Sequence, residues 1–131
     1  MALAVNENTF RKYEKLTEKV FIDRLFSKGK TLACKNFRLI FFEHAQDDIA
    51  PVRLLISVPK KRFKHAVERN RIKRLIREAY RLNKSSLIAH YETQQLKCHL
   101  AIIYTGSDII DFESTQQLLC LLFKKLMHRK T

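Results

Sequence analysis

The sequence predicts a single-domain α+β protein. Its 131 residues are 46% apolar and include nine Phe, which is enough to bury a hydrophobic core, while two Gly and two Pro leave little material for linkers. Segments with the apolar spacing of amphipathic helices alternate with segments rich in β-forming residues. We therefore expect residues 1–131 to form one domain in which helices cover a sheet.

A first helix is predicted over residues 17–28, with Thr17 as its N-cap and Gly29 as its stop. Apolar residues recur there at the three- and four-residue spacings of a core-facing stripe. These residues are Val20, Phe21, Leu25 and Phe26. The segment before the helix, with Phe10 and Tyr13, is expected to be a basic and irregular lead-in.

Two strands are predicted next, over residues 31–44 and 52–58, and the polar turn HAQDDIAP separates them. We expect them to be adjacent and antiparallel. On each strand, the less apolar of the two faces carries an arginine, Arg38 on the first strand and Arg53 on the second. This side of the sheet is therefore either an exposed groove or merely a solvated surface. The residues that share these faces with the arginines are Ile40, Phe42, Leu55 and Ser57.

The longest predicted helix begins near His65 or Ala66 and ends at Asn83. Its packing face is expected to contain Ile72, Leu75, Ile76, Ala79 and Leu82, with Tyr80 at the border. Residues 85–97 are predicted to form a short helix, capped by Ser85 or Ser86, and then a loop.

The last two elements are a strand and a helix. Residues 98–106 form a near-continuous apolar run, which predicts a strand buried on both faces. A final helix is predicted to start at Asp111 as its cap and to extend through Arg129. Its core stripe contains Leu118, Leu119, Leu122, Phe123 and Leu126, and its basic end contains Lys124, Lys125, His128, Arg129 and Lys130. This basic end either complements the helix dipole or contacts RNA in addition to the basic stretch described next, and we favour the dipole.

Positive charge is concentrated in one stretch of the chain. The net charge is +13, and residues 60–84 contain eleven Lys or Arg against only two Glu. On the long predicted helix these cations lie opposite the packing face, nearly without the opposite charges that stabilise a solvated helix. Arginine forks bind phosphate oxygens in pairs, so the stretch predicts a nucleic-acid partner rather than a solvated face.

Other functional classes find little support in the sequence. The apolar runs are too short for a membrane span, and the first ten residues lack the pattern of a secretory signal, so we expect a cytoplasmic protein without membrane attachment. Three cysteines without CxxC spacing suggest buried thiols in a reducing compartment. The five histidines and the carboxylates are expected to be scattered, which predicts neither a catalytic set nor a metal site.

The segment ERNRIKRLIREAY resembles the RNR signature of the bacterial ribonuclease P protein family. The similarity extends through SVPKKRFKHAV before it, and includes the first-helix end FSKG, the NFRL strand, a late apolar strand and a basic C-terminal helix. The resemblance implies an α-β-β-β-α-β-α sandwich with a left-handed βαβ crossover, contrary to the usual handedness.

The resemblance also implies a function. Members of the family assist a catalytic RNA that removes the 5′ leader of precursor tRNA, and the RNA holds the Mg²⁺ ions and performs the chemistry. The partners implied are therefore the ribonuclease P catalytic RNA and the precursor tRNA leader, with no stable protein partner. The predicted RNA-binding residues are Lys60, Lys61, Arg62, Arg69, Asn70, Arg71, Lys73, Arg74, Arg77 and Arg81.

In the family, a cleft between the sheet and the first helix holds the single-stranded leader. The corresponding residues here are Ile22, Phe26, Arg38, Ile40 and Phe42. Phe26 matches a cleft aromatic, whereas Ile22 and Ile40 stand where many members have aromatic residues. Since each stacked base contributes about 1–3 kcal/mol, we expect weaker or altered leader recognition unless Phe42 compensates. The alternative function is a general RNA- or DNA-binding module without an enzymatic role.

Overall fold

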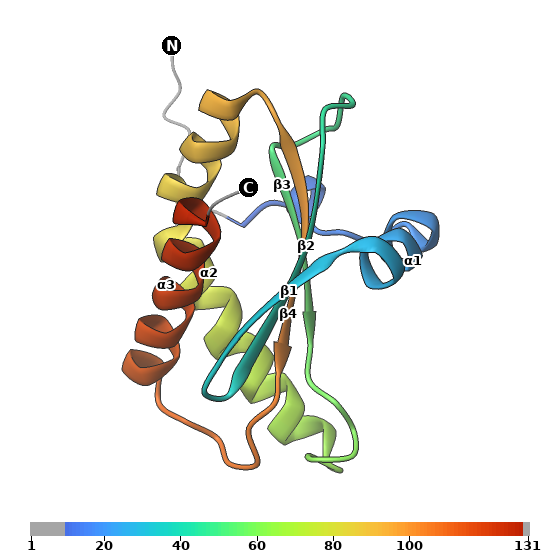
Figure 1. The fold of residues 1–131 in the computed structure, drawn as a ribbon. Helices are drawn as coiled ribbons and strands as arrows, with labels where there is room; N and C mark the ends of the chain where they lie inside the picture. Colours follow the sequence, from blue (N-terminus) through green and yellow to red (C-terminus); the bar gives the residue numbers. More distant parts are fainter. Residues whose placement is uncertain (1–9, 130–131) are drawn as a thin grey trace.

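Strand-forming segments pair into one sheet, and amphipathic helices cover both of its faces (Figure 1). The computed structural model describes residues 10–129. The elements are η1 (Lys12–Glu14), α1 (Lys19–Lys28), β1 (Lys30–Cys34), β2 (Phe37–His44), β3 (Val52–Ser57), α2 (Ala66–Gln94), β4 (Lys97–Tyr104) and α3 (Phe112–His128). This order confirms the α-β-β-β-α-β-α arrangement, with η1 as a single 3₁₀ turn in the lead-in. Within residues 10–129, no helix is long and apolar enough to cross a membrane.

The first predicted strand is in fact a hairpin. β1 pairs antiparallel with β2, and Lys30 lies opposite Phe41 at the open end of the pair. The turn between the strands contains Asn36 with φ 69°, a left-handed conformation that asparagine tolerates better than most residues. The start of β1 lies close against β2, since a Cβ atom on Gly29 would come within 2.8 Å of Ile40 Cγ2. This close approach explains why glycine ends α1.

The strand order is β1-β2-β4-β3, so the prediction that β2 and β3 are neighbours is wrong. β4 lies between them, antiparallel to β2 and parallel to β3. Its apolar run accounts for this position, because a strand buried on both faces is most stable in the middle of a sheet. α2 connects β3 to β4 as a βαβ unit.

Two hydrophobic cores lie on opposite sides of the sheet. The larger core lies under α2 and α3 and contains Leu100 and Ile102 of β4. The smaller core lies under α1 and contains Leu16, Leu25, Ile40 and Ala101. The predicted alternation of faces in β2 and β3 is confirmed, because Ile40, Phe42 and Leu55 face α1 whereas their neighbours face the larger core.

α2 continues without a break to Gln94, so the prediction of a helix end at Asn83 followed by a new short helix is wrong. The buried stripe continues through Leu87 and Tyr91, which pack in the larger core. Tyr80 is fully buried, whereas Leu82 is 39% exposed and does not belong to the packing face. The helix ends at Gln95, whose left-handed conformation closes the last turn.

α3 follows the prediction closely. The Asp111 side chain accepts a hydrogen bond of 2.8 Å from the backbone N–H of Ser114, as an N-cap does. Leu119, Leu122, Phe123 and Leu126 are buried, and Leu118 is partly buried against them.

Arg53 explains how α1 is attached to the sheet. Its side chain is buried, and it donates hydrogen bonds of 2.9 and 2.8 Å to the Glu18 carboxylate at the start of α1. It also donates to the carbonyl oxygens of Tyr13 and Lys15. Arg53 is therefore buried against the start of α1 and is not a solvated side chain. Glu18 rather than Thr17 stands at the N-cap position of α1.

The predicted core face of α1 is correct in part. Leu25 is fully buried and Phe21 is half-buried, but Val20 is 74% exposed. Val20 is excluded from the core because α1 contacts the sheet through the stripe that contains Phe21, Ile22 and Leu25.

Acid is expected to weaken the attachment of α1. The hydrogen bonds from Arg53 lower the pKa of Glu18 from its ordinary 4.5 to about 2. A lowered pKa contributes stability that is complete above pH 4.5 and is lost as the pH falls toward 2. Urea unfolding of the wild type and of Glu18→Gln should therefore differ near neutral pH and converge as the pH approaches 2. A constant difference across this range would contradict the assignment.

Candidate nucleic-acid interface

The loop between β3 and α2 presents four cations from a fixed backbone. Val58 and Phe63 are buried, and the Phe63 ring lies 5.9 Å from the ring of Tyr104 in the core. Between them, the N–H of Arg62 donates to the carbonyl of Pro59, forming a turn. The basic side chains of the loop are exposed, namely Lys60, Lys61, Arg62 and Lys64.

Arg69 fastens this loop to the first turns of α2. Its Nη1 donates hydrogen bonds of 2.8 and 2.9 Å to the carbonyl oxygens of Phe63 and Lys64. The sequence predicted Arg69 as an RNA contact, and its position at the junction leaves that prediction in place. In addition, the structure gives it a positioning role for the loop, which the sequence did not indicate.

One side of α2 forms a cationic face, which we define as Asn70, Arg71, Lys73, Arg74 and Arg77. All are exposed except Lys73, which is half-buried. Arg81 continues the face but forms an ion pair with Glu78, three residues earlier in the helix.

Lys84 lies outside this face. It is buried, and its Nζ lies 2.6 Å from a carboxylate oxygen of Glu14 in the lead-in. The basic surface of α2 therefore ends near Arg81.

A groove of about 220 Å³ lies between the lead-in, β3 and α2. Lys73 and Arg77 line it from α2, while Leu55 and Ile56 line it from β3. Phe10 lines the third side, and its ring contacts Tyr80 edge-on at 5.6 Å. Cations beside an apolar floor suit a single strand, whose phosphates and bases need both. The sequence did not predict this groove, because the lead-in lies against α2 only in the folded chain.

The predicted cleft residues lie on the side of the sheet that faces α1. Ile22 and Phe42 are half-buried in the smaller core, and Ile40 is only 8% exposed. Phe26, at 47% exposure, and Arg38 reach the surface. Arg38 of β2 and Ser57 of β3 both lie opposite Ile103 of β4, one on each side of it. These three residues form a row across the sheet, next to the row that contains Ile40 on the same face. The fold thus places all five residues on one side, with two accessible to a ligand.

The basic end of α3 has both structural and exposed members. Arg129 pairs with Glu43 of β2, and its guanidinium lies 4.6 Å from the centre of the Phe41 ring. Lys124, Lys125 and His128 are exposed, and Lys130 lies outside the described residues. Arg129 therefore attaches α3 to the sheet.

The prediction that the three thiols are buried is correct only for Cys98. Cys98 is buried, and burial raises its pKa to about 12, whereas Cys34 and Cys120 are partly exposed.

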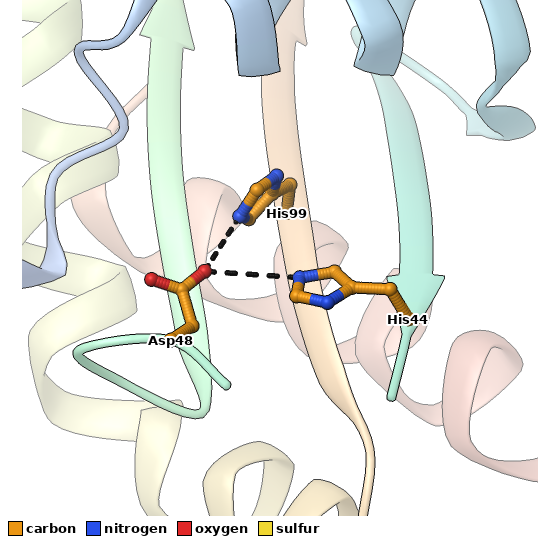
Figure 2. Close-up of side chains that lie close together, drawn as sticks. All are labelled: His44, Asp48 and His99. Atoms are coloured by element: carbon orange, nitrogen blue, oxygen red, sulfur yellow. Dashed lines mark hydrogen bonds and ion pairs between the residues drawn. The ribbon is translucent and has the colours of Figure 1, made fainter. Parts of the chain in front are cut away.

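The prediction that the histidines are scattered is wrong for two of them. His44 at the end of β2 and His99 in β4 meet at Asp48 in the β2–β3 loop (Figure 2). Burial lowers the pKa of both histidines. Burial raises the pKa of Asp48, but the hydrogen bonds from His99 and the Ile49 N–H, together with the charge of Arg53, outweigh it, and the pKa is lowered. Sequence spacing could not indicate this cluster, because it depends on the pairing of β2 with β4. Among the described residues, these three could hold a metal ion.

Comparison with known proteins gives a consistent result. The family model for ribonuclease P matches residues 10–127. A ribonuclease P protein component from Porphyromonas gingivalis is 35% identical over 106 residues, covering 81% of this chain and 77% of that protein. One from Chlorobium phaeobacteroides is 37% identical over 109 residues, covering 76% and 73%.

Solved structures agree with the sequence matches. The structure of the Staphylococcus aureus RNase P protein superimposes with a TM-score of 0.70 at 26% identity, covering 88% of this chain and 96% of that one. The Thermotoga maritima RNase P protein gives a TM-score of 0.66 at 25% identity, covering 85% and 96%.

Proposed function

This chain belongs to the ribonuclease P protein family, and on that basis we propose that it binds the catalytic RNA of ribonuclease P and the 5′ leader of precursor tRNA. As the protein subunit of this endoribonuclease, it takes part in 5′ maturation of tRNA. The observation that carries the proposal is the continuous arrangement of the loop cations, the cationic face of α2 and the groove beside Lys73 and Arg77.

The loop and α2 would bind the catalytic RNA. Lys60, Lys61 and Arg62 extend from a loop that is fixed at both ends, and Arg71, Arg74 and Arg77 lie along one side of a helix. Fixed cations bind phosphates with little loss of conformational entropy, and each phosphate neutralised releases counterions. Asn70 adds an amide that can both donate and accept hydrogen bonds at a base edge or a ribose hydroxyl.

The leader would lie on the α1 side of the sheet. Phe26 offers an exposed ring for one base, and Arg38 offers a cation for a phosphate. Ile22, Ile40 and Phe42 would offer little surface for stacking on bases, because they pack in the smaller core. Leader recognition in this chain would therefore depend mainly on one aromatic face.

Cleavage itself is assigned to the RNA. The protein would lower the Mg²⁺ concentration that the RNA needs, because its cations offset phosphate repulsion where the two RNAs meet. The Mg²⁺ ions would be held mainly by the RNA subunit. We place the enzyme in the cytoplasm, with residues 1–131 acting as one RNA-binding domain.

Reconstitution tests this function. Adding the protein to a ribonuclease P RNA from the same source is expected to restore cleavage of a precursor tRNA leader at a low Mg²⁺ concentration at which the RNA alone is inactive. Phe26→Ala is expected to keep this stimulation but to weaken binding of leader-containing substrate by about 1–3 kcal/mol relative to mature tRNA.

Two results would contradict the proposal. Absence of stimulation would exclude the subunit function and would favour a general RNA-binding module. Equal weakening of precursor and mature tRNA by Phe26→Ala would exclude the leader assignment while leaving the subunit function intact. Phe112→Ala, on α3 at the other side of the sheet, serves as a matched control with no expected effect on leader selectivity.

A further inference from the structure

A buried group of metal-ligating side chains lies under α1, apart from the cationic face of α2. His44 and His99 come from β2 and β4, and Asp48 comes from the loop before β3 (Figure 2). Their side chains are all more than nine-tenths buried. His99 Nε2 lies 2.7 Å and His44 Nε2 lies 3.7 Å from the same oxygen, Oδ2 of Asp48. One ligand atom from each residue lies within 4.8 Å of the others.

His44 is the unusual member of this group. Both of its ring nitrogens are buried, and neither has a hydrogen-bond partner within the described chain. The 3.7 Å separation from Asp48 is too long for a hydrogen bond. A buried imidazole without partners is costly, since each unsatisfied polar atom loses its hydration. A ligand that accepts the lone pair of Nε2 would remove the part of this cost that belongs to Nε2.

The spacing fits a small cation with tetrahedral preference. In a zinc site with bonds of about 2.0–2.2 Å, neighbouring ligand atoms lie about 3.3–3.6 Å apart. The observed separations of 2.7 and 3.7 Å lie on either side of this range. Two imidazoles and one carboxylate suit Zn²⁺ or Co²⁺, whereas Mg²⁺ prefers oxygen ligands alone.

Asp48 is already oriented for this role. Its Oδ1 accepts a hydrogen bond of 2.7 Å from the backbone N–H of Ile49 and lies 3.5 Å from Arg53 Nη1. These contacts leave Oδ2 directed at the two histidines. Secondary contacts of this kind fix the ligand atom of a carboxylate and are typical of metal sites.

A depression of about 430 Å³, rich in carboxylates, borders the group at Asp48. Glu18, Asp47 and Asp48 line it, together with Arg53, Phe21 and Ile49. On a chain with a net charge of +13, this local concentration of carboxylates attracts small cations and disfavours RNA.

The Arg24 guanidinium lies beside the site, where its positive charge repels a metal ion. It also determines which ring nitrogen of His99 carries the proton. Its Nη2 lies 3.4 Å from His99 Nδ1, so in the present arrangement Nδ1 accepts and the Nε2–H donates to Asp48. When His99 coordinates the metal ion through Nε2, that proton must move to Nδ1, so no proton is released to solvent. The Arg24 guanidinium also lies over the Phe42 ring, 4.4 Å from its centre, so it would have to turn its Nη2 away from Nδ1 when the ion binds.

We propose that His44, Asp48 and His99 form a binding site for one divalent transition-metal ion of the Zn²⁺ class, which joins β2, β4 and the β2–β3 loop beneath α1.

Cobalt titration of the full-length protein tests the site. The chain carries Cys34→Ser and Cys120→Ser, so that partly exposed thiols cannot bind the ion. Co²⁺ is expected to bind with one-to-one stoichiometry and to give the visible bands of a four- or five-coordinate ion without thiolate charge transfer. Zn²⁺ should displace it and raise the midpoint of thermal unfolding, whereas Mg²⁺ should do neither.

Matched variants locate the ion. His44→Gln is expected to abolish stoichiometric binding, and a cooperative unfolding transition measured in chelator checks that the variant is folded, because the His44 ring packs on Phe42 and His99. His90→Gln, on α2, is expected to bind as the parent does. Arg24→Gln is expected to bind more tightly, since it removes a cation beside the site. Long-range ¹H–¹⁵N spectra should show the His99 proton moving from Nε2 to Nδ1 when Zn²⁺ is added.

The proposal is overturned by absence of stoichiometric binding, by equal binding to His44→Gln, by binding to Arg24→Gln that is unchanged or weaker, or by a His99 proton that stays on Nε2 at saturating Zn²⁺. None of these measurements depends on ribonuclease activity, so their outcome is independent of the proposed function.

Discussion

Replacing Arg71, Arg74 and Arg77 together with alanine is expected to weaken binding of ribonuclease P RNA by about a hundredfold at about 0.15 M monovalent salt. Each of these arginines lies on the exposed cationic face of α2. If each contacts one phosphate, counterion release contributes about 0.9 units of the salt slope per contact. The slope of log K against log salt should therefore decrease in magnitude by nearly three.

Salt dependence separates this effect from damage to the fold. The three side chains are exposed, so the free energy of unfolding should not fall, and relief of repulsion among like charges can raise it slightly. A matched control removes the same charge elsewhere, through Lys19→Ala, Lys124→Ala and Lys125→Ala. We expect the control to lose much less affinity, because Lys19 pairs with Asp23 and the other two lie at the end of α3. Equal losses in the two variants would show that net charge, rather than the face of α2, determines binding.

Lys84→Met is expected to destabilise the protein by about 3–5 kcal/mol. Lys84 and Glu14 are both buried and lie 2.6 Å apart, so removing the ammonium leaves a carboxylate uncompensated in the interior. The energetic cost comes mainly from the group left behind. Urea unfolding followed by circular dichroism measures it.

A double variant checks this explanation. Glu14→Leu combined with Lys84→Met should recover most of the lost stability, because no buried charge then remains without a partner. Lys64→Met, at an exposed position in the loop before α2, should change the free energy of unfolding by less than about 0.5 kcal/mol. The explanation is wrong if the double variant is as unstable as the sum of the two single ones.

The local patterns in the sequence predicted the elements better than their arrangement. The alternation of Arg38, Ile40 and Phe42 indicated their common face correctly, and Asp111 caps α3 as expected. The order of strands could not be derived in this way. It depends on β4, which is distant from β2 in the sequence and takes the centre because both of its faces are apolar.

The end of α2 shows a second limit of local patterns. Asn83, Ser85 and Ser86 suggested a break, because such residues often start or end helices. In the fold the Asn83 side chain donates hydrogen bonds of 2.8 Å to the carbonyl of Ala79 and to Gln116 of α3, and the two serines face solvent. Burial of Leu87 and Tyr91 then extends the helix. Tertiary packing therefore outweighs the local preference.

In the candidate sites, too, local sequence predicted some features and tertiary packing determined the others. The charge of the loop and of α2 is a property of contiguous sequence, and it predicted the exposed cations correctly. The buried pairs Arg53–Glu18 and Lys84–Glu14 join distant segments, so the charges of Arg53 and Lys84 could not be assigned to the interior beforehand. The His44–Asp48–His99 group was hidden for the same reason, since three separate segments supply it.

The central position of β4 also determines the order in which the chain can fold during synthesis. β2 and β3 leave the ribosome well before β4, so β2 keeps one edge unpaired, and β3 has no partner strand, until α2 and then residues 97–104 have emerged. An unpaired edge is a site for pairing with other chains. While α2 is being translated, these two edges are therefore open to pairing with other chains, and insertion of β4 between them covers both.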